Sequence, residues 1–150
     1  MFSKELDFFL EANKTKRIVF TNGCFDIIHK GHVAYLNEAK KLGDLLVVGL
    51  NSDKSVKRLK GEERPINNEL DRQYVMGQLK PVDFVEIFHE DTPLNLILKV
   101  KPKILVKGGD WKIEQIVGGK EVIADGGEVF SLKFVDGYST TSIINKIQNT

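Results

Sequence analysis

The sequence has little cysteine and no long apolar run. A single cysteine, Cys24, leaves no partner for an internal disulfide. No apolar stretch approaches the ~20 residues that a membrane-spanning helix needs. The N-terminal segment differs from a secretory signal peptide, because charged side chains interrupt its apolar residues: Lys4, Glu5, Asp7 and Glu11. These absences predict a cytoplasmic protein with no membrane partner.

An excess of one charge is also missing. The 22 lysines and arginines nearly balance the 21 aspartates and glutamates, for a formal net charge of +1. General nucleic-acid binding needs a marked basic excess, so we expect no nucleic-acid partner, although a local basic cluster for a small anion fits these numbers. A length of 150 residues with 41% hydrophobic content predicts one domain over residues 1–150 with a core of its own.

Several common cofactor motifs are absent. The sequence has neither a G-x-x-x-x-G-K-[ST] P-loop nor a G-x-G-x-x-G fingerprint. No metal site is predicted, because the spacing of four potential zinc ligands fits no zinc pattern: Cys24, Asp26, His29 and His32. Nothing in the sequence marks a base that would activate Cys24 as a nucleophile.

Short β-rich runs alternate with helical stretches along the chain. The runs predict strands at residues 17–21, 45–50, 83–88, 103–107 and 128–132. Because these runs are continuously apolar, they favour a parallel sheet buried on both faces. Helices are predicted at about residues 31–42, 69–79, 93–101, 114–125 and 140–148, after an N-terminal helix within residues 1–14. The alternation predicts an α/β, Rossmann-like, open and mainly parallel five-stranded sheet with helices on both faces.

Polar clusters follow four of the five predicted strands. Open parallel sheets bind ligands outside the carboxyl ends of their strands, at the switch in strand order. The clusters lie in residues 21–32, 51–64, 107–111 and 136–142. Together they predict a basic, hydroxyl-rich and glycine-rich rim on one edge of the sheet. Such a rim suits a ligand that carries phosphate.

Two histidines stand where the first strand leads into a helix. His29 and His32 flank Gly31, near the predicted helix start. A helix N-terminus offers unpaired N–H groups and the positive end of the helix dipole. We therefore expect both imidazoles to share one anionic group, and we expect Gly23 and Gly31 to allow a ligand close to the backbone. An ordinary helix start with two hydrogen-bonded histidines is the alternative.

Two further segments each allow two interpretations. The run Ser139-Thr140-Thr141-Ser142 opens the last helix, where it serves as an N-cap, as a phosphate site or as both. The segment 54–64 is charged and contains glycine. It is either a solvated loop or a mobile lid beside the site.

The residues resemble a known superfamily. His29-Lys30-Gly31-His32 is similar to the H-x-G-H signature of the nucleotidyltransferases that include cytidylyltransferases and phosphopantetheine adenylyltransferase, and residues 139–142 resemble the second signature of that superfamily. Four segments most resemble heptose 1-phosphate adenylyltransferases: TNGCFDIIHKGHVAYL, RLKGEERPI, VKGGDW and STTSIINKI. Tyr138 departs from many relatives, which carry isoleucine before the Ser/Thr run. The arginine that often precedes this run in cytidylyltransferases is also absent, which makes a cytidylyltransferase assignment less attractive.

The resemblance implies adenylyl transfer. ATP and D-glycero-β-D-manno-heptose 1-phosphate would give ADP-heptose and pyrophosphate with Mg²⁺, for lipopolysaccharide or other surface glycans. It also implies a homodimer, and a stand-alone form that works with a separate sugar kinase. A cytidylyltransferase acting on glycerol 3-phosphate, an FMN adenylyltransferase and a nucleotide-sensing module without turnover remain as alternatives.

The resemblance also implies roles for individual residues. The catalytic residues would be His29, His32 and Lys107. The ATP-binding residues would be Thr21, Asn22, Gly23, Cys24, Phe25, Asp26, Gly31, Gly108, Asp110, Trp111, Tyr138, Ser139, Thr140 and Thr141. Lys60, Arg64 and Arg72 would bind the sugar phosphate or pyrophosphate, and Arg72 could instead make an ion pair on a helix surface. Mg²⁺ would be held mainly by ATP, with Asp26 either anchoring the loop or contacting the metal. No general base is needed, because the second pKa of a phosphate is ~6.

Overall fold

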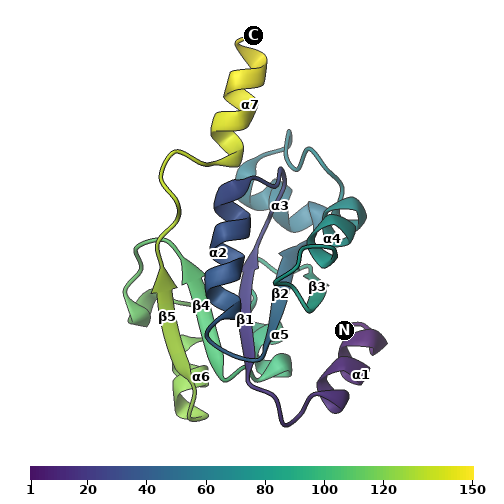
Figure 1. The fold of residues 1–150 in the computed structure, drawn as a ribbon. Helices are drawn as coiled ribbons and strands as arrows, with labels where there is room; N and C mark the ends of the chain where they lie inside the picture. The colour runs from purple at the N-terminus through teal and green to yellow at the C-terminus, as the bar shows by residue number, and fades with distance from the viewer.

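One five-stranded sheet organises the chain. The computed structural model describes residues 1–150. The strands are β1 (Ile18–Gly23), β2 (Leu45–Asn51), β3 (Phe84–Phe88), β4 (Ile104–Gly108) and β5 (Glu128–Leu132). They pair in the order β3-β2-β1-β4-β5, and every pairing is parallel. The predicted α/β, Rossmann-like sheet is confirmed (Figure 1).

Seven helices accompany the sheet. They are α1 (Lys4–Ala12), α2 (Lys30–Lys40), α3 (Asp53–Lys60), α4 (Glu69–Gly77), α5 (Leu94–Val100), α6 (Gly119–Ala124) and α7 (Thr140–Gln148), with a 3₁₀ turn at Ile113–Gln115. None of them is long and apolar enough to cross a membrane.

The apolar strands are buried because helices cover both faces of the sheet. On one face α2 and α4 enclose a core that includes Val19, Leu36, Val48 and Met76. On the other face α1, α5 and α6 enclose a second core, to which Leu6, Phe20, Leu96 and Val122 belong. The strand order reverses between β1 and β4, so the ligand crevice of such a sheet lies at their carboxyl ends.

Two predicted segments differ from the structure. The expected loop 54–64 is helical up to Lys60, because Ser52 caps α3 and Val56 is buried beneath it. Only residues 61–68 remain as a loop before α4. The expected helix 114–125 is broken, because Gly118 adopts a left-handed backbone with φ of 82° and α6 starts only after it.

Helix α1 is fixed to the edge strand β3 by a buried carboxylate. Glu86 Oε1 accepts a hydrogen bond from Ser3 N at 2.7 Å, and Glu86 Oε2 accepts one from Ser3 Oγ at 2.6 Å. The rings of Phe9 and Phe84 pack 4.9 Å apart beside this contact. The side chain that caps α1 therefore also holds α1 against the sheet.

We expect Glu86→Ala to lower the free energy of unfolding by about 1–3 kcal/mol, because two partly buried donors of Ser3 lose their acceptor. Urea denaturation measures this loss. Hydrogen exchange of residues 3–12 should quicken as α1 loosens. The exposed Glu62→Ala is the matched control, and equal effects of the two variants would contradict the anchoring role.

Candidate active site

The loop after β1 turns back on itself before α2. Phe25 has a left-handed backbone with φ of 46°, an uncommon conformation for a residue with a side chain. Its ring fills the space beside Gly23, where an added Cβ would lie 2.8 Å from Phe25 Cε2. Room for a ligand at Gly23 therefore stays a prediction, because a side chain of the protein occupies that space here.

The two histidines form a stacked pair at the start of α2. Their ring centroids lie 3.7 Å apart with an interplanar angle of 23°. His29 occupies the N-cap position, and its backbone N–H donates to His32 Nδ1 at 3.3 Å. The ring of Phe25 meets His32 edge-on at 5.2 Å. Because His32 Nδ1 accepts a hydrogen bond, the proton of the neutral ring belongs on Nε2.

Both imidazoles favour the neutral form. Burial lowers the pKa of His29, and burial together with the neighbouring His29 lowers the pKa of His32 to about 4. His29 Nδ1 is buried and has no hydrogen-bond partner in the chain. A polyanion placed against the pair would favour the imidazolium forms and accept their hydrogen bonds.

The start of α7 lies beside the histidine pair. The ring of Tyr138 is 6.2 Å from that of His29, and a Cβ added to Gly31 would come within 2.9 Å of Tyr138 Cβ. Thr140 Oγ1 donates to Ile27 O at 3.2 Å. The structure therefore brings together the two signature segments, which lie more than one hundred residues apart in the sequence.

The hydroxyl run at α7 has a capping role. Ser139 Oγ accepts the backbone N–H of Ser142 at 3.0 Å, which makes Ser139 the N-cap of α7. Ser142 Oγ donates back to Ser139 O at 2.9 Å. The capping interpretation is thus right for Ser139. Thr141 is exposed, and phosphate binding by these hydroxyls stays a prediction.

The carboxyl end of β4 supplies a cation and an aromatic ring. Lys107 Nζ lies 5.2 Å from the centre of the Trp111 ring, and burial lowers the pKa of Lys107. Trp111 Nε1 donates to Gly108 O at 3.1 Å, while Asp110 is exposed. This end of β4 faces the crevice at the switch in strand order.

Asp26 anchors the loop that follows β1. Its carboxylate accepts hydrogen bonds from the backbone N–H groups of Ile66 and Asn67 at 2.8 and 2.9 Å, and from Arg64 Nε at 2.9 Å. Burial would raise the pKa of Asp26, but these donors together lower it. Of its two predicted roles, the structure supports loop anchoring. The structure contains no group of three or more His, Cys, Asp or Glu side chains that could hold a metal ion.

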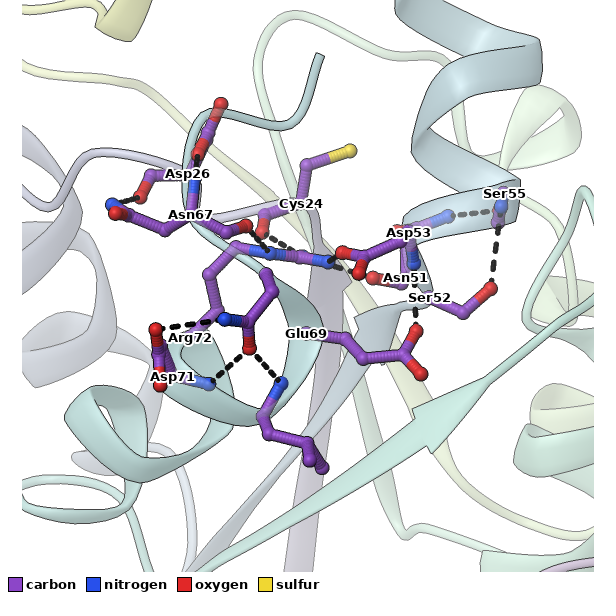
Figure 2. Close-up of polar contacts among 12 residues, drawn as sticks. Cys24, Asp26, Asn51, Ser52, Asp53, Ser55, Asn67, Glu69, Asp71 and Arg72 are labelled. Carbon is purple, nitrogen blue, oxygen red and sulfur yellow. Dashed lines mark hydrogen bonds and ion pairs between the residues drawn. The ribbon is translucent and has the colours of Figure 1, made fainter.

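Arg72 is buried rather than on the helix surface. Its guanidinium donates to the carbonyl oxygens of Asn67, Cys24 and Asn51 at 2.7 to 2.9 Å, and to Asp53 Oδ1 at 2.9 Å (Figure 2). The side chain is 1% exposed, so the helix-surface alternative is wrong. Four of the five guanidinium N–H groups therefore donate hydrogen bonds to other residues of the chain. Arg72 is therefore a positioning residue that ties the ends of β1 and β2 to α3 and the loop 61–68.

The remaining predicted site residues differ in how deeply they are buried. Arg64 pairs with Asp26 and is 17% exposed, whereas Lys60 is exposed at the end of α3. Thr21 is fully buried, and its hydroxyl forms a 2.6 Å hydrogen bond with Tyr35 Oη. Asn22 is half-buried at the end of β1. Burial raises the pKa of the Cys24 thiol, which keeps it protonated and unreactive at neutral pH.

Comparison with known proteins agrees with this geometry. The model of the family described as Cytidylyltransferase-like matches residues 20–146. The bifunctional protein HldE of Campylobacter concisus (strain 13826) is 58% identical over 146 residues, which are 97% of this chain and 30% of that protein. HldE of Proteus mirabilis (strain HI4320) is 60% identical over 139 residues, 93% of this chain and 29% of that protein. The chain thus spans about 30% of the length of these relatives.

Solved structures share the fold. The lipopolysaccharide core biosynthesis protein of Thermoplasma volcanium has a TM-score of 0.66 at 35% identity, covering 83% of this chain and 99% of that chain. Pantothenate synthetase of Thermus thermophilus, at 16% identity and a TM-score of 0.57, shares the fold over 87% of this chain and 60% of its own. The chain belongs to the cytidylyltransferase-like family, which confirms the superfamily recognised from the two signatures. It is a nucleotidyltransferase.

We expect Arg72→Met to lower the free energy of unfolding by about 3 kcal/mol or more, because buried carbonyl oxygens and Asp53 lose their donors. Urea denaturation measures the change. Arg58→Met is the control, since Arg58 pairs with Asp91 in solvent and should cost less than about 1 kcal/mol. If both variants had equal stability, Arg72 would not hold the loops together.

The histidine pair predicts a pH dependence. The pKa of His32 in the folded protein, about 4, lies below the ordinary 6.5. Neutral His32 therefore stabilises the fold above pH 6.5, and this stability is lost as the pH falls from 6.5 through about 4. His32→Gln should flatten the fall in unfolding free energy over this window, whereas the exposed His89→Gln should not. An NMR titration that found His32 half-protonated near pH 6.5 would refute the prediction.

Proposed function

We propose that this chain transfers the AMP group of ATP to a heptose 1-phosphate, giving ADP-heptose and pyrophosphate. The observation that carries the proposal is the stacked His29–His32 pair at a helix N-terminus, directly beside the capped start of α7. The similarity of the sequence segments to heptose 1-phosphate adenylyltransferases supports the choice of acceptor. Relatives named bifunctional protein HldE and lipopolysaccharide core biosynthesis protein support it further.

In the proposed reaction a sugar-phosphate oxygen attacks the α-phosphorus of ATP. The bond from that phosphorus to the oxygen bridging to the β-phosphate breaks, and pyrophosphate leaves with the electron pair. The attacking phosphate is already ionised near neutral pH, so no base has to remove a proton. The chain contributes positioning and hydrogen-bond donors, as phosphoryl transfer requires.

The donors act on the charge that develops at the α- and β-phosphates. His29 and His32 donate to these oxygens, together with the free N–H groups at the start of α2. Lys107, at the end of β4, adds a cation. The neutral imidazoles donate through their ring N–H groups, and these hydrogen bonds strengthen as negative charge builds on the phosphate oxygens.

The acceptor occupies the side of the crevice away from β4. A cleft between residues 25–28 and α4 opens there, with Ile28 and Val75 as apolar walls and Asn67 and Asp71 as polar ones. Such a mixture suits a sugar, which presents both C–H faces and hydroxyl groups. Arg64 and Lys60 are the cations assigned to the sugar phosphate or pyrophosphate in this scheme, while Arg72 acts through the loops that it holds.

The proposal also includes partners. Mg²⁺ enters with ATP and neutralises phosphate charge. A sugar kinase supplies the heptose 1-phosphate. The protein works in the cytoplasm, where ATP is available, as a homodimer.

Pyrophosphate release tests the reaction. The protein is incubated with ATP or CTP and a panel that comprises heptose 1-phosphate, glycerol 3-phosphate and FMN. We expect release only with ATP and heptose 1-phosphate, with ADP-heptose as the second product. Release with CTP and glycerol 3-phosphate would assign a cytidylyltransferase instead. Nucleotide binding without any release would assign a sensor.

We expect His32→Ala to lower kcat by about 10²-fold or more with a small change in KM for ATP, because its hydrogen bond strengthens in the transition state. Steady-state kinetics of pyrophosphate release measure both constants. Thr140→Ala should instead raise KM for ATP. Near-normal turnover in His32→Ala would remove the imidazole from the catalytic step.

A further inference from the structure

The segment between β5 and α7 places an aromatic ring on the end of β4. A Cβ added to Gly108 would lie 2.4 Å from Phe134 Cζ, so the ring rests on the backbone of that glycine. Its other aromatic neighbour is Tyr35 of α2, with ring centroids 5.6 Å apart. Phe134 is nevertheless 53% exposed. A large apolar ring is thus held over the ligand crevice with half of its surface in solvent.

A second aromatic ring meets the next glycine. Gly109 has φ of 113°, a conformation that favours glycine, and the turn there brings Trp111 Nε1 within 2.9 Å of the position of an added Cβ. The same position lies 3.7 Å from Phe134 Cε2. Trp111 is 45% exposed. Two half-exposed rings therefore converge on one diglycine from two separate parts of the chain.

Neither ring is paired with the other. Phe134 neighbours Tyr35, and Trp111 neighbours the ammonium group of Lys107. Each of the two residues has about half of its surface in solvent. Lone exposed aromatic residues are common and need no explanation, but two of them beside a cation at the switch in strand order are placed as ligand walls.

We propose that Phe134 and Trp111 form the two walls of a stacking site for the base of the nucleotide. Any base presents a π-face, and stacking on aromatic side chains is a general means of holding one. The phosphates then extend from the base past Lys107 toward the histidine pair. This inference rests on the proposed function only in taking a nucleoside triphosphate as the ligand, and it assigns to Phe134 a role that its sequence context did not indicate.

The glycines follow from the same arrangement. Gly108 carries no side chain because Phe134 covers it, and a methyl group there would push the ring away from its position. The stacking site thus needs Gly108 as well as the two rings. Gly108→Ala should therefore weaken base binding in the same way as a change at Phe134.

The only tryptophan of the chain, Trp111, reports directly on the site. Its fluorescence is followed while the protein is titrated with the non-hydrolysable α,β-methylene analogue of ATP in the presence of Mg²⁺. A parallel titration uses inorganic tripolyphosphate, which has the phosphates but no base, and calorimetry gives Kd for both. We expect the nucleotide analogue to change the Trp111 fluorescence strongly and tripolyphosphate to change it little.

We expect Phe134→Ala to weaken binding of the nucleotide analogue by about 5- to 100-fold, the range for one base–aromatic contact, and to leave tripolyphosphate binding unchanged. Phe134→Leu keeps an apolar side chain on Gly108 and should lose most of the same affinity, whereas Phe134→Tyr should retain it. Phe8→Ala, which removes another exposed phenyl ring on α1, is the matched control and should bind as the unchanged protein does.

Three results would overturn the stacking site. Phe134→Ala could bind the nucleotide analogue as tightly as the unchanged protein, or more tightly because the ring blocks the site. It could also lose tripolyphosphate binding to the same extent, which would point to a general structural defect. Normal AMP transfer with unchanged nucleotide affinity in Phe134→Ala would refute the stacking site alone. Failure of the unchanged protein to bind any nucleotide would refute the proposed function as well.

Discussion

A buried guanidinium sets the geometry of the site. Arg72 needs oxygen acceptors because an isolated charge inside a protein is costly, and it finds them at the ends of two strands and in the loop before α4. Asp26 binds the same loop from the other side through backbone N–H groups. The loop that leads from β1 to the histidine pair is therefore held at both its strand end and its centre. The position of His29 and His32 depends on these two charges.

The site gathers hydrogen-bond donors more than fixed charge. Burial lowers the pKa of both imidazoles, which favours their neutral forms, and the start of α2 contributes N–H groups. An anion-binding site of this kind costs little in self-repulsion while it is empty. A bound polyphosphate would make the site more positive, because the anion would favour protonation of both rings. The balanced overall composition of the chain is consistent with such a site, which needs no basic surface.

The sequence predicted the sheet, because continuous apolar runs indicate parallel strands that are buried on both faces. It also predicted that the two signatures meet, because the segments that follow parallel strands lie at the same edge of the sheet. It missed α3, whose exposed face is basic and whose buried side offers little more than Val56. The role of Arg72 was hidden because three of its four partners are backbone carbonyls, which no side-chain pattern reveals. Phe134 was hidden for a related reason: its partner is a glycine, which offers no side chain to match.

Helix α7 stands away from the sheet and buries none of its residues, while the N-terminus lies at the other end of the molecule (Figure 1). Its first turn nevertheless borders the histidine pair. A nine-residue helix with so few neighbours is marginal by itself. A fusion protein or affinity tag is therefore better joined to the N-terminus, since a load on the C-terminus would strain the turn that contacts Ile27 and lies beside His29.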